Sequence, residues 1–440
     1  DWEVKRVLPI INEDINEEWI SDKTRYACDG LLNQRIDSPY IKYNNKFEKA
    51  SWDEVYKIIK SKIENTDKEK ICGLLGDLTS MEASFIFKEF FERTIDTNKY
   101  DFRTSESFID NTVRENYLFN AQINGIEDAD FVLIIGSNPR FEATMLNARI
   151  RKAYLKNKTN IVSLNDIGDL TYPYKNLNGK TQTIKNIVDN NNEISKDIIN
   201  SKKPMIILGE SFLKSKSAEF LFYSLKIFLS KNNKFTDDWN PINILSSDAS
   251  TVGCLDLDIV DTKNELIKSL NENKFEIVYL LGQDNFIFNK KNEFIIYQGS
   301  HGDKGAQIAD IILPGAAYTE QSGHFTNLEG KIQKAYKASY PPGEAKEDWQ
   351  IINDLAEVMN NRKLFNDKDE LESSMHNYLN LKKEKYNNDV KELNSKDFRD
   401  EDLKVKFKDY YFSNVIARSS KTMLDCNNSK INIKRTGTEG

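Results

Sequence analysis

The sequence predicts an α/β protein with doubly wound, mostly parallel sheets in two interleaved domains, preceded by a small β leader. Short apolar runs alternate with amphipathic helical patterns between residues 52 and 164, and the alternation resumes at residue 205. Buried parallel strands joined by helices produce this pattern. The chain has 440 residues, more than one hydrophobic core usually organises, so we expect at least two domains.

Composition and charge exclude several classes of protein. The formal net charge is −7, and no nucleic-acid-binding motif is present, so nothing attracts the chain to a phosphate backbone. The longest apolar stretches, residues 131–136 and 311–317, are much shorter than the roughly 18 residues that a membrane-spanning helix needs. We therefore expect neither a nucleic acid partner nor a direct membrane span.

Neither the cysteines nor the histidines form a recognisable pattern. The four cysteines lie far apart and include no CxxC pair; they are Cys28, Cys72, Cys254 and Cys426. This spacing predicts neither a closed metal site nor a disulfide framework. The three histidines are also separated, and none has a serine or cysteine arranged as an obvious nucleophile; they are His301, His324 and His376. We therefore predict no catalytic triad and no metal site.

The first half of the chain gives these elements in order. Residues 1–45 read as short strands and loops. The following pattern predicts helices and strands at 52–63 (helix), 71–75 (strand), 81–91 (helix, opened by Ser80), 131–135 (strand), 144–155 (helix) and 160–164 (strand).

A polar stretch at residues 176–203 separates this series from the next. The second series predicts elements at 205–208 (strand), 213–229 (helix), 275–281 (strand), 294–298 (strand) and 347–359 (helix), with turns and a β-like run between 308 and 340. Residues 361–408 are highly charged and are predicted to be helical or loop-like.

We expect five regions from these patterns. Residues 1–45 form the β-rich leader, 46–175 the first α/β domain and 176–345 the second. Residues 346–426 form a helical region that closes on the first domain. Residues 427–440 lack periodicity and are expected to form a flexible or partner-bound tail.

A glycine-rich loop is the first candidate binding site. Gly299, Gly302 and Gly305 follow a predicted strand at three-residue spacing, where backbone N–H groups can cradle a phosphate. The spacing is not GxGxxG, and an ordinary tight strand exit gives the same pattern. His301 lies in this loop and is the histidine to test first, although a hydrogen bond to backbone or water is the favoured interpretation.

A second candidate site follows the strand at residues 131–135. Asn138 and Arg140 lie directly after this strand, where open α/β sheets bind ligands. Arg149 and Arg151 follow on the next helix. These arginines can bind anions, but arginines there more often form ion pairs or face a partner.

One segment carries a resemblance to the molybdopterin-oxidoreductase superfamily. Residues 309–320 (ADIILPGAAYTE), continued by Gly323, Asn327 and Glu329-Gly330-Lys331, resemble that superfamily's ADxxLP signature, with Lys331 in place of the usual arginine. Residues 347–349 (EDW) at a helix start are also similar to its pattern. The resemblance implies a molybdopterin-oxidoreductase-like fold.

Within that superfamily the chain resembles the largest iron–sulfur subunit of complex I, the G-type subunit of NADH:ubiquinone oxidoreductase, in its mitochondrial form. Four stretches carry this resemblance, at residues 12–25, 136–152, 295–320 and 409–423. The resemblance implies a core subunit of the peripheral arm, on the matrix side of the mitochondrial inner membrane. There it would support the relay from NADH to ubiquinone that is coupled to proton translocation.

The resemblance also implies where the cofactors lie. No catalytic residue, metal or cofactor is expected in this chain; iron–sulfur clusters and FMN are expected in partner subunits of the arm, including a cluster-bearing ferredoxin-like chain or domain. That cluster region is expected either to have been removed or to be encoded separately. Ser21 stands where some bacterial relatives carry a cysteine for an extra cluster. The resemblance therefore implies that the leader forms a hairpin that holds no cluster.

The pterin cleft is then expected to be vestigial, and its candidate residues are those of the two loops: Asn138, Arg140, Gly299, His301, Gly302 and Gly305. Two other functions remain open. One is a stand-alone molybdopterin-dependent oxidoreductase of the formate dehydrogenase type, which requires bound molybdenum or tungsten. The other is a nucleotide-binding α/β protein that uses the loop from Gly299 to Gly305.

Overall fold

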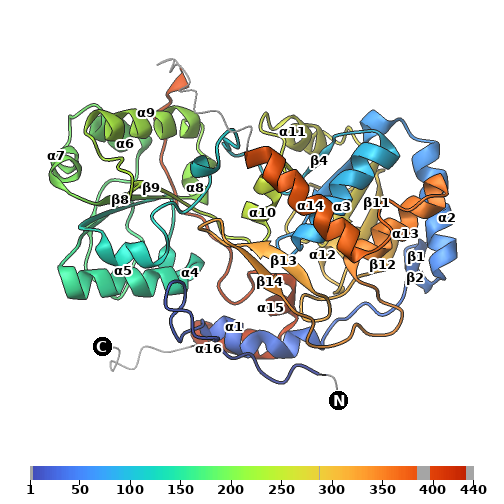
Figure 1. Ribbon diagram of the computed structural model, residues 1–440. Coiled ribbons are helices and arrows are strands. Elements are labelled where there is room, and N and C mark those ends of the chain that lie inside the picture. Colours follow the sequence, from blue (N-terminus) through green and yellow to red (C-terminus); the bar gives the residue numbers. More distant parts are fainter. Residues whose placement is uncertain (1–2, 287, 384–396, 433–440) are drawn as a thin grey trace.

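Two sheets, each in its own lobe, organise the protein (Figure 1). The computed structural model describes residues 3–286, 288–383 and 397–432. The two lobes lie side by side, and short helices from both ends of the chain, α1 and α16, lie together below them (Figure 1). The predicted α/β fold with mostly parallel sheets is confirmed.

The larger lobe is built on a seven-stranded sheet of order β2-β1-β12-β11-β10-β3-β4. Its strands are β1 (Tyr40–Tyr43), β2 (Lys46–Lys49), β3 (Ile71–Leu75), β4 (Tyr100–Asp101), β10 (Ile277–Leu281), β11 (Phe294–Gly299) and β12 (Ile311–Pro314). The five strands from β12 to β4 are parallel, while β1 and β2 add an antiparallel hairpin at one edge. The central strands β3 and β10 are buried along their whole length, as expected for parallel strands covered on both faces.

Helices cover both faces of this sheet. One face packs against α2 (Trp52–Glu64), α3 (Met81–Phe90), α13 (Asp348–Asn360) and α14 (Lys368–Lys383). The other face packs against α11 (Glu265–Asn271) and α12 (Lys304–Ile308). Ser51 and Ser80 accept backbone N–H groups at the starts of α2 and α3, so each helix begins where its cap occurs in the sequence.

The smaller lobe is built on a five-stranded, fully parallel sheet of order β7-β6-β5-β8-β9. Its strands are β5 (Phe131–Ile135), β6 (Asn160–Ser163), β7 (Lys175–Asn176), β8 (Pro204–Gly209) and β9 (Ile242–Leu245). One face packs against α6 (Thr181–Val188), α7 (Glu193–Asn200) and α9 (Ala218–Lys231), and the other against α5 (Thr144–Asn157). Alternate residues of each strand enter the two cores.

The remaining elements are short. They are α1 (Asp22–Tyr26), η1 (Ala27–Leu31), η2 (Lys68–Lys70), η3 (Phe91–Ile95), η4 (Arg114–Asn116), η5 (Asn124–Asp128), α4 (Pro139–Glu142), α8 (Glu210–Leu213), α10 (Thr251–Asp256), the hairpin strands β13 (Gly323–Thr326) and β14 (Ile332–Ala335), α15 (Val415–Ser419) and α16 (Lys421–Asn432). The helices α15 and α16 pack against η1, which brings residues near the two ends of the chain together.

The structure corrects the predicted domain boundaries. A boundary at residue 175/176 falls inside the five-stranded sheet, because β7 ends at Asn176 and β8 and β9 come later in the chain. The seven-stranded sheet likewise combines strands from residues 40–101 and 277–314. Each domain is therefore discontinuous. This agrees with the predicted interleaving of two domains, but the contiguous boundaries were wrong because local periodicity does not show where the chain leaves a sheet and returns to it.

Three smaller expectations are also corrected. The described residues of the leader, 3–45, are not β-rich, since α1 and η1 are helical and regular β structure is limited there to β1 and two isolated bridges, one between Asn12 and Glu17 and one between Arg35 and His301. The polar stretch at 176–203 contains α6 and α7, whose narrow apolar stripes are each only eight residues long. The predicted tail begins within α16, and its last residues, 433–440, lie outside the described part.

In the larger lobe, α13 packs against α2 and α3, and α14 packs against α3. Among the described residues, no helix combines the length and the apolar character needed to cross a bilayer.

Candidate functional site

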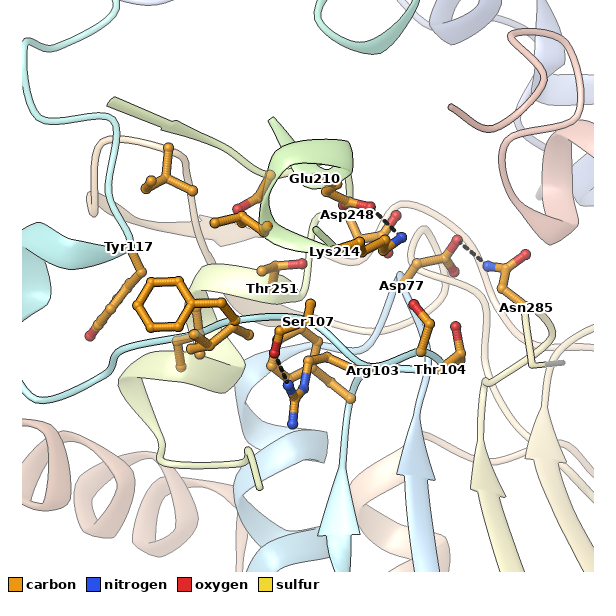
Figure 2. Close-up of a pocket in the computed structure, with 18 of the residues that line it drawn as sticks. Asp77, Arg103, Thr104, Ser107, Tyr117, Glu210, Lys214, Asp248, Thr251 and Asn285 are labelled. Atoms are coloured by element: carbon orange, nitrogen blue, oxygen red, sulfur yellow. Dashed lines mark hydrogen bonds and ion pairs between the residues drawn. The ribbon is translucent and has the colours of Figure 1, made fainter. Parts of the chain in front are cut away.

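A cavity of about 400 Å³ lies where the carboxyl ends of strands from both sheets meet (Figure 2). Its wall is formed by the segments after β3, β4 and β10 of one sheet and after β8 and β9 of the other. Ligands of open α/β proteins bind at this end of the strands, and small-molecule sites are commonly a few hundred Å³. We refer to it as the interdomain cavity.

One part of the interdomain cavity is apolar. Its large apolar and aromatic lining residues are Phe102, Phe108, Ile109, Tyr117, Leu213, Ile244, Leu255 and Phe286. Arg103 lies beside them but is not a free cation, because its guanidinium pairs with the buried Asp101 at 2.6 Å and donates to the Ser107 carbonyl oxygen at 3.0 Å. Figure 2 shows Arg103 turned toward Ser107 at the edge of the cavity.

The other part is charged, and Lys408 is its centre. The Lys408 ammonium lies 2.5 Å from Asp248 and 3.3 Å from Asp77. Asn285 donates to Asp77 at 2.9 Å, a contact drawn in Figure 2. Burial lowers the pKa of Lys408, but the carboxylates of Asp248 and Asp77 outweigh it and raise that pKa. Burial and the neighbouring carboxylates raise the pKa of Asp248, despite Lys408.

Glu210 adds a third carboxylate to this group. It lies at the start of α8, directly after β8, and pairs with Lys214 at 3.2 Å (Figure 2). It also accepts the Ser247 backbone N–H at 3.2 Å. The charged end of the interdomain cavity therefore consists of three carboxylates and the two lysines paired with them, held by segments from both sheets, and Lys304 also lines the cavity.

A second cavity of about 180 Å³ shares Asp77, Asp248 and Lys408 with the first. Its other lining residues include Lys23 from the leader and Glu142 from α4. Burial raises the pKa of Glu142 to about 7, although the Asn138 N–H and the Ser137 hydroxyl donate to it. Lys23 donates to Ser413 at 2.9 Å, so the leader and residues 409–423 meet at this second cavity.

The three glycines of the loop after β11 do not line either cavity, although Lys304 of the same loop lines the interdomain cavity. The Gly302 N–H donates to the Gln34 carbonyl oxygen at 2.7 Å, and the Gly305 N–H donates to the Asp284 carboxylate at 2.8 Å. Tyr297 also donates to Asp284, at 2.9 Å. Burial raises the pKa of Asp284 to about 7. Acceptors of the protein itself, the Gln34 carbonyl oxygen and the Asp284 carboxylate, thus engage the amides that would hold a phosphate.

His301 is fully buried in the same loop. Its Nε2 lies 2.9 Å from the Gly30 carbonyl oxygen, and its Nδ1 lies 2.8 Å from the Ser300 hydroxyl. Burial lowers the pKa of His301 to about 4, so the ring is neutral at pH 7, donating from Nε2 and accepting at Nδ1. His301 therefore connects the leader to the end of β11 through these hydrogen bonds. At the same end of β11, the Gly299 carbonyl oxygen accepts the Gly315 N–H at 2.9 Å.

The loop after β5 is also engaged within the protein. Asn138 is buried, caps α4 and donates to the Ile167 carbonyl oxygen at 2.9 Å. Arg140 pairs with the exposed Asp169 at 2.6 Å. Arg149 is buried against Glu127 at 2.7 Å and donates to the Ile15 carbonyl oxygen of the leader. Arg140 and Arg149 thus make ion pairs, the alternative considered for them from the sequence, whereas Arg151 donates to the Thr171 carbonyl oxygen at 3.3 Å.

The six residues singled out from the sequence, Asn138, Arg140, Gly299, His301, Gly302 and Gly305, therefore do not come together at a cavity, and none is among the lining residues of the two described above. Sequence reasoning missed Asp77, Glu210 and Asp248. Each follows a buried strand by three residues or fewer, so the rule that ligand sites follow parallel strands was the signal for them. Lys408 lies in a charged stretch without periodicity, and no signal marked it.

Comparison with known families and proteins gives consistent matches along the chain. The molybdopterin oxidoreductase family model matches residues 35–358. A model described as NADH-ubiquinone oxidoreductase NDSU1/NuoG-like, 4Fe-4S domain, matches residues 2–29, and one for the C-terminal part of the G-type subunit of NADH-ubiquinone oxidoreductase matches residues 380–426.

Individual relatives agree with these models. The chain is 38% identical to the mitochondrial NADH-ubiquinone oxidoreductase 78 kDa subunit of Candida albicans, over 96% of this chain and 61% of that protein. It is 38% identical to the G-type subunit of NADH-quinone oxidoreductase from Rickettsia bellii, over 99% of this chain and 64% of that protein. It thus spans less than two thirds of the length of these relatives. The predicted resemblance to this complex I subunit is confirmed.

A solved structure shows the same fold at low identity. The formyltransferase/hydrolase complex of Methylorubrum extorquens matches with a TM-score of 0.50 and 12% identity, over 73% of this chain and 98% of that one. Because the molybdopterin oxidoreductase model covers well over half of the residues, from the hairpin edge of the larger sheet to α13, the chain belongs to the molybdopterin oxidoreductase family.

Proposed function

We propose that the chain is a core subunit of the peripheral arm of respiratory complex I, on the matrix side of the mitochondrial inner membrane. It would scaffold the iron–sulfur relay from NADH to ubiquinone and have no redox centre of its own. The observation that carries this proposal is the end-to-end similarity to proteins named as subunits of NADH-ubiquinone and NADH-quinone oxidoreductase.

The leader supports a docking role. Leu8, Ile10, Ile11 and Trp19 have exposed fractions of 55%, 86%, 69% and 58%, and all lie within the stretch matched by the 4Fe-4S domain model. Exposed apolar residues grouped in this way favour burial against another protein surface. A cluster-bearing ferredoxin-like chain or domain is the partner we propose for this surface.

The proposal that this chain holds no cluster rests on thiol chemistry. An iron–sulfur cluster is usually held by four converging thiolates. Cys28 is the single cysteine in the stretch matched by the 4Fe-4S model, while Cys72 and Cys254 are buried in different cores. We therefore propose that iron–sulfur clusters and FMN are held by partner subunits.

The interdomain cavity does not fit a pterin dinucleotide. Such a group brings phosphates, which need cationic side chains or free backbone N–H donors. Here Asp77, Glu210 and Asp248 place three carboxylates at the charged end, and Lys408 and Lys214 are already paired with them, which leaves Lys304 as the one further lysine among the described lining residues. A catalytic role of the formate dehydrogenase type is thus disfavoured, and no reaction step is assigned to this cavity.

The nucleotide-binding alternative is weakened because the groups that would bind a phosphate already have partners within the protein. It requires the amides of the loop from Gly299 to Gly305 to face a phosphate. The Gly302 and Gly305 N–H groups donate instead to Gln34 and Asp284.

Native-gel migration tests the proposed function. The tagged chain is followed in detergent-solubilised membranes, with the gel stained for NADH oxidation. We expect it to comigrate with a very large NADH-oxidising band. Migration as a small species without that activity would contradict the proposal.

A pair of variants tests the proposed docking surface in the same gel. Ile10→Asp combined with Ile11→Asp places charges on the leader and should shift the chain out of the large band. Leu155→Asp is the matched control, because Leu155 is also exposed, at 53%, but lies on α5 of the smaller lobe. Equal behaviour of the two variants would count against docking through the leader.

A further inference from the structure

Two histidines and two carboxylates meet on the outer helical layer of the larger lobe. Glu82 lies on α3, His324 on β13, and Glu372 and His376 on α14. Glu82, His324 and Glu372 each present a possible ligand atom, and these atoms lie within 4.8 Å of one another. His376 follows Glu372 by one helical turn, and its ring centroid is 5.5 Å from that of His324.

Glu82 fixes the orientation of His324. Its side chain is 1% exposed, and its carboxylate accepts a hydrogen bond from Nδ1 of His324 at 2.5 Å and from the backbone N–H of His324 at 2.8 Å. Because Nδ1 carries the proton of this bond, Nε2 is the nitrogen available to a metal. Metal-binding histidines usually donate their second ring N–H to a carboxylate in this way.

The charges around this cluster favour the binding of a cation. Glu82 and Glu372 are close enough to repel each other. Lys334 lies 3.2 Å from Glu372, but its side chain is 35% exposed and is free to move into solvent. The side chains of His324 and Glu372 are 12% and 19% exposed, and His376 is exposed, so an ion can reach them from solvent.

We propose that His324, Glu372 and His376 bind a divalent transition metal, zinc by the chemistry of its ligands, while Glu82 orients His324. Imidazole nitrogens and a carboxylate oxygen suit zinc, and three protein ligands leave the fourth position to water. Ligand atoms around zinc lie about 3.4 Å apart, since each bond is about 2.1 Å long. Closing the site would require the side chains of Glu372 and His376 to rotate toward Nε2 of His324.

A metal bound at this site would connect three elements of the fold: β13, α3 and α14. The β13–β14 hairpin overlaps the end of the signature segment and lies against α3, while α14 belongs to the helical layer on the same face of the larger sheet. A bound metal would fasten the hairpin to both helices. No metal site was expected from the sequence, because these ligands come from segments that only the fold brings together.

Zinc titration of the 440-residue chain by calorimetry tests the proposal. We expect one site per chain, and Glu372→Gln and His376→Ala should each weaken zinc binding by at least about tenfold, as even loss of an outer ligand contact does. Asp369→Asn is the matched control, because Asp369 is exposed on the same helix and outside the cluster. Lys334→Met removes the competing cation and should tighten binding.

A second readout separates the site from adventitious binding. Cobalt in place of zinc should give the visible absorption of a tetrahedral site in the wild type and lose it in Glu372→Gln. Circular dichroism checks that each variant is folded. The proposal is overturned if the folded wild type binds no zinc, or if Glu372→Gln and Asp369→Asn bind it equally well.

Discussion

The glycine-rich loop after β11 belongs to the larger lobe alone, whereas the charged end of the interdomain cavity is shared by both lobes, and the two are built in opposite ways. The loop is local in sequence, and its N–H donors are satisfied by nearby protein acceptors, Gln34 and Asp284. The cavity is assembled from Asp77, Glu210, Asp248 and Lys408, which are far apart in the chain. The glycine motif, which can be recognised in the sequence, serves internal packing here. The cavity could be recognised only once the fold was known.

The largest expected effect comes from adding a methyl group to the loop. A Cβ at position 305 would overlap the buried Tyr297 ring and lie 2.8 Å from the Gln283 carbonyl oxygen. Gly305→Ala should therefore destabilise the protein by about 3 kcal/mol, as overpacking of a core does. Gly302→Ala is the control, since its nearest neighbour is 3.7 Å away. Urea denaturation measures both; equal stability would show that the loop is not tightly packed.

Removal of the central cation of the cavity should have the next largest effect. Lys408→Met leaves Asp77 and Asp248 without their shared partner. We expect a loss of about 2 kcal/mol, less than for a fully buried pair, because the Lys408 side chain is 31% exposed. Lys404→Met, at an exposed position of the same segment, is the control and should leave the free energy of unfolding unchanged. If both variants unfold alike, Lys408 does not stabilise the cavity.

A smaller effect is expected from the pH dependence of the loop. The pKa of Asp284 is raised to about 7 in the folded protein, so the folded state favours the protonated acid. Its contribution to stability is complete below the ordinary pKa of aspartate and is lost as the pH rises through about 7. Between pH 6 and pH 7 this loss is about 1 kcal/mol.

Asp284→Asn keeps the shape of the side chain and removes its titration. Thermal or urea unfolding across this pH range should therefore show a steeper loss of stability in the wild type than in Asp284→Asn. Parallel curves for the two proteins would mean that Asp284 is ionised throughout.

Strands and helices with strong periodicity were predictable from the sequence alone. The strand at Ile71–Leu75 and the strand at Phe131–Ile135 have the predicted bounds because every residue in them is buried and apolar. The order of strands in each sheet was not predictable, since β3 pairs with β10, about 200 residues later. The short helices α6 and α7 were missed because eight residues give too few turns for a clear period.

The sites were harder to predict than the fold. Loops that bind a phosphate and loops whose N–H groups donate to the protein itself can have the same glycine spacing. The spacing of Gly302 and Gly305 therefore could not distinguish between these two kinds of loop. Lys408 and His376 acquire their neighbours only through tertiary packing, and neither has a local pattern that indicates a role.

Pterin and metal analysis of the purified assembly tests most directly the claim that this member of the molybdopterin oxidoreductase family has no redox centre of its own. The assembly that copurifies with the tagged chain, proposed to oxidise NADH, is denatured, its pterin content is read by fluorescence after oxidation, and molybdenum and tungsten are measured by mass spectrometry. We predict no pterin and neither metal above the level of a mock purification. One pterin and one molybdenum or tungsten atom per chain would contradict the claim.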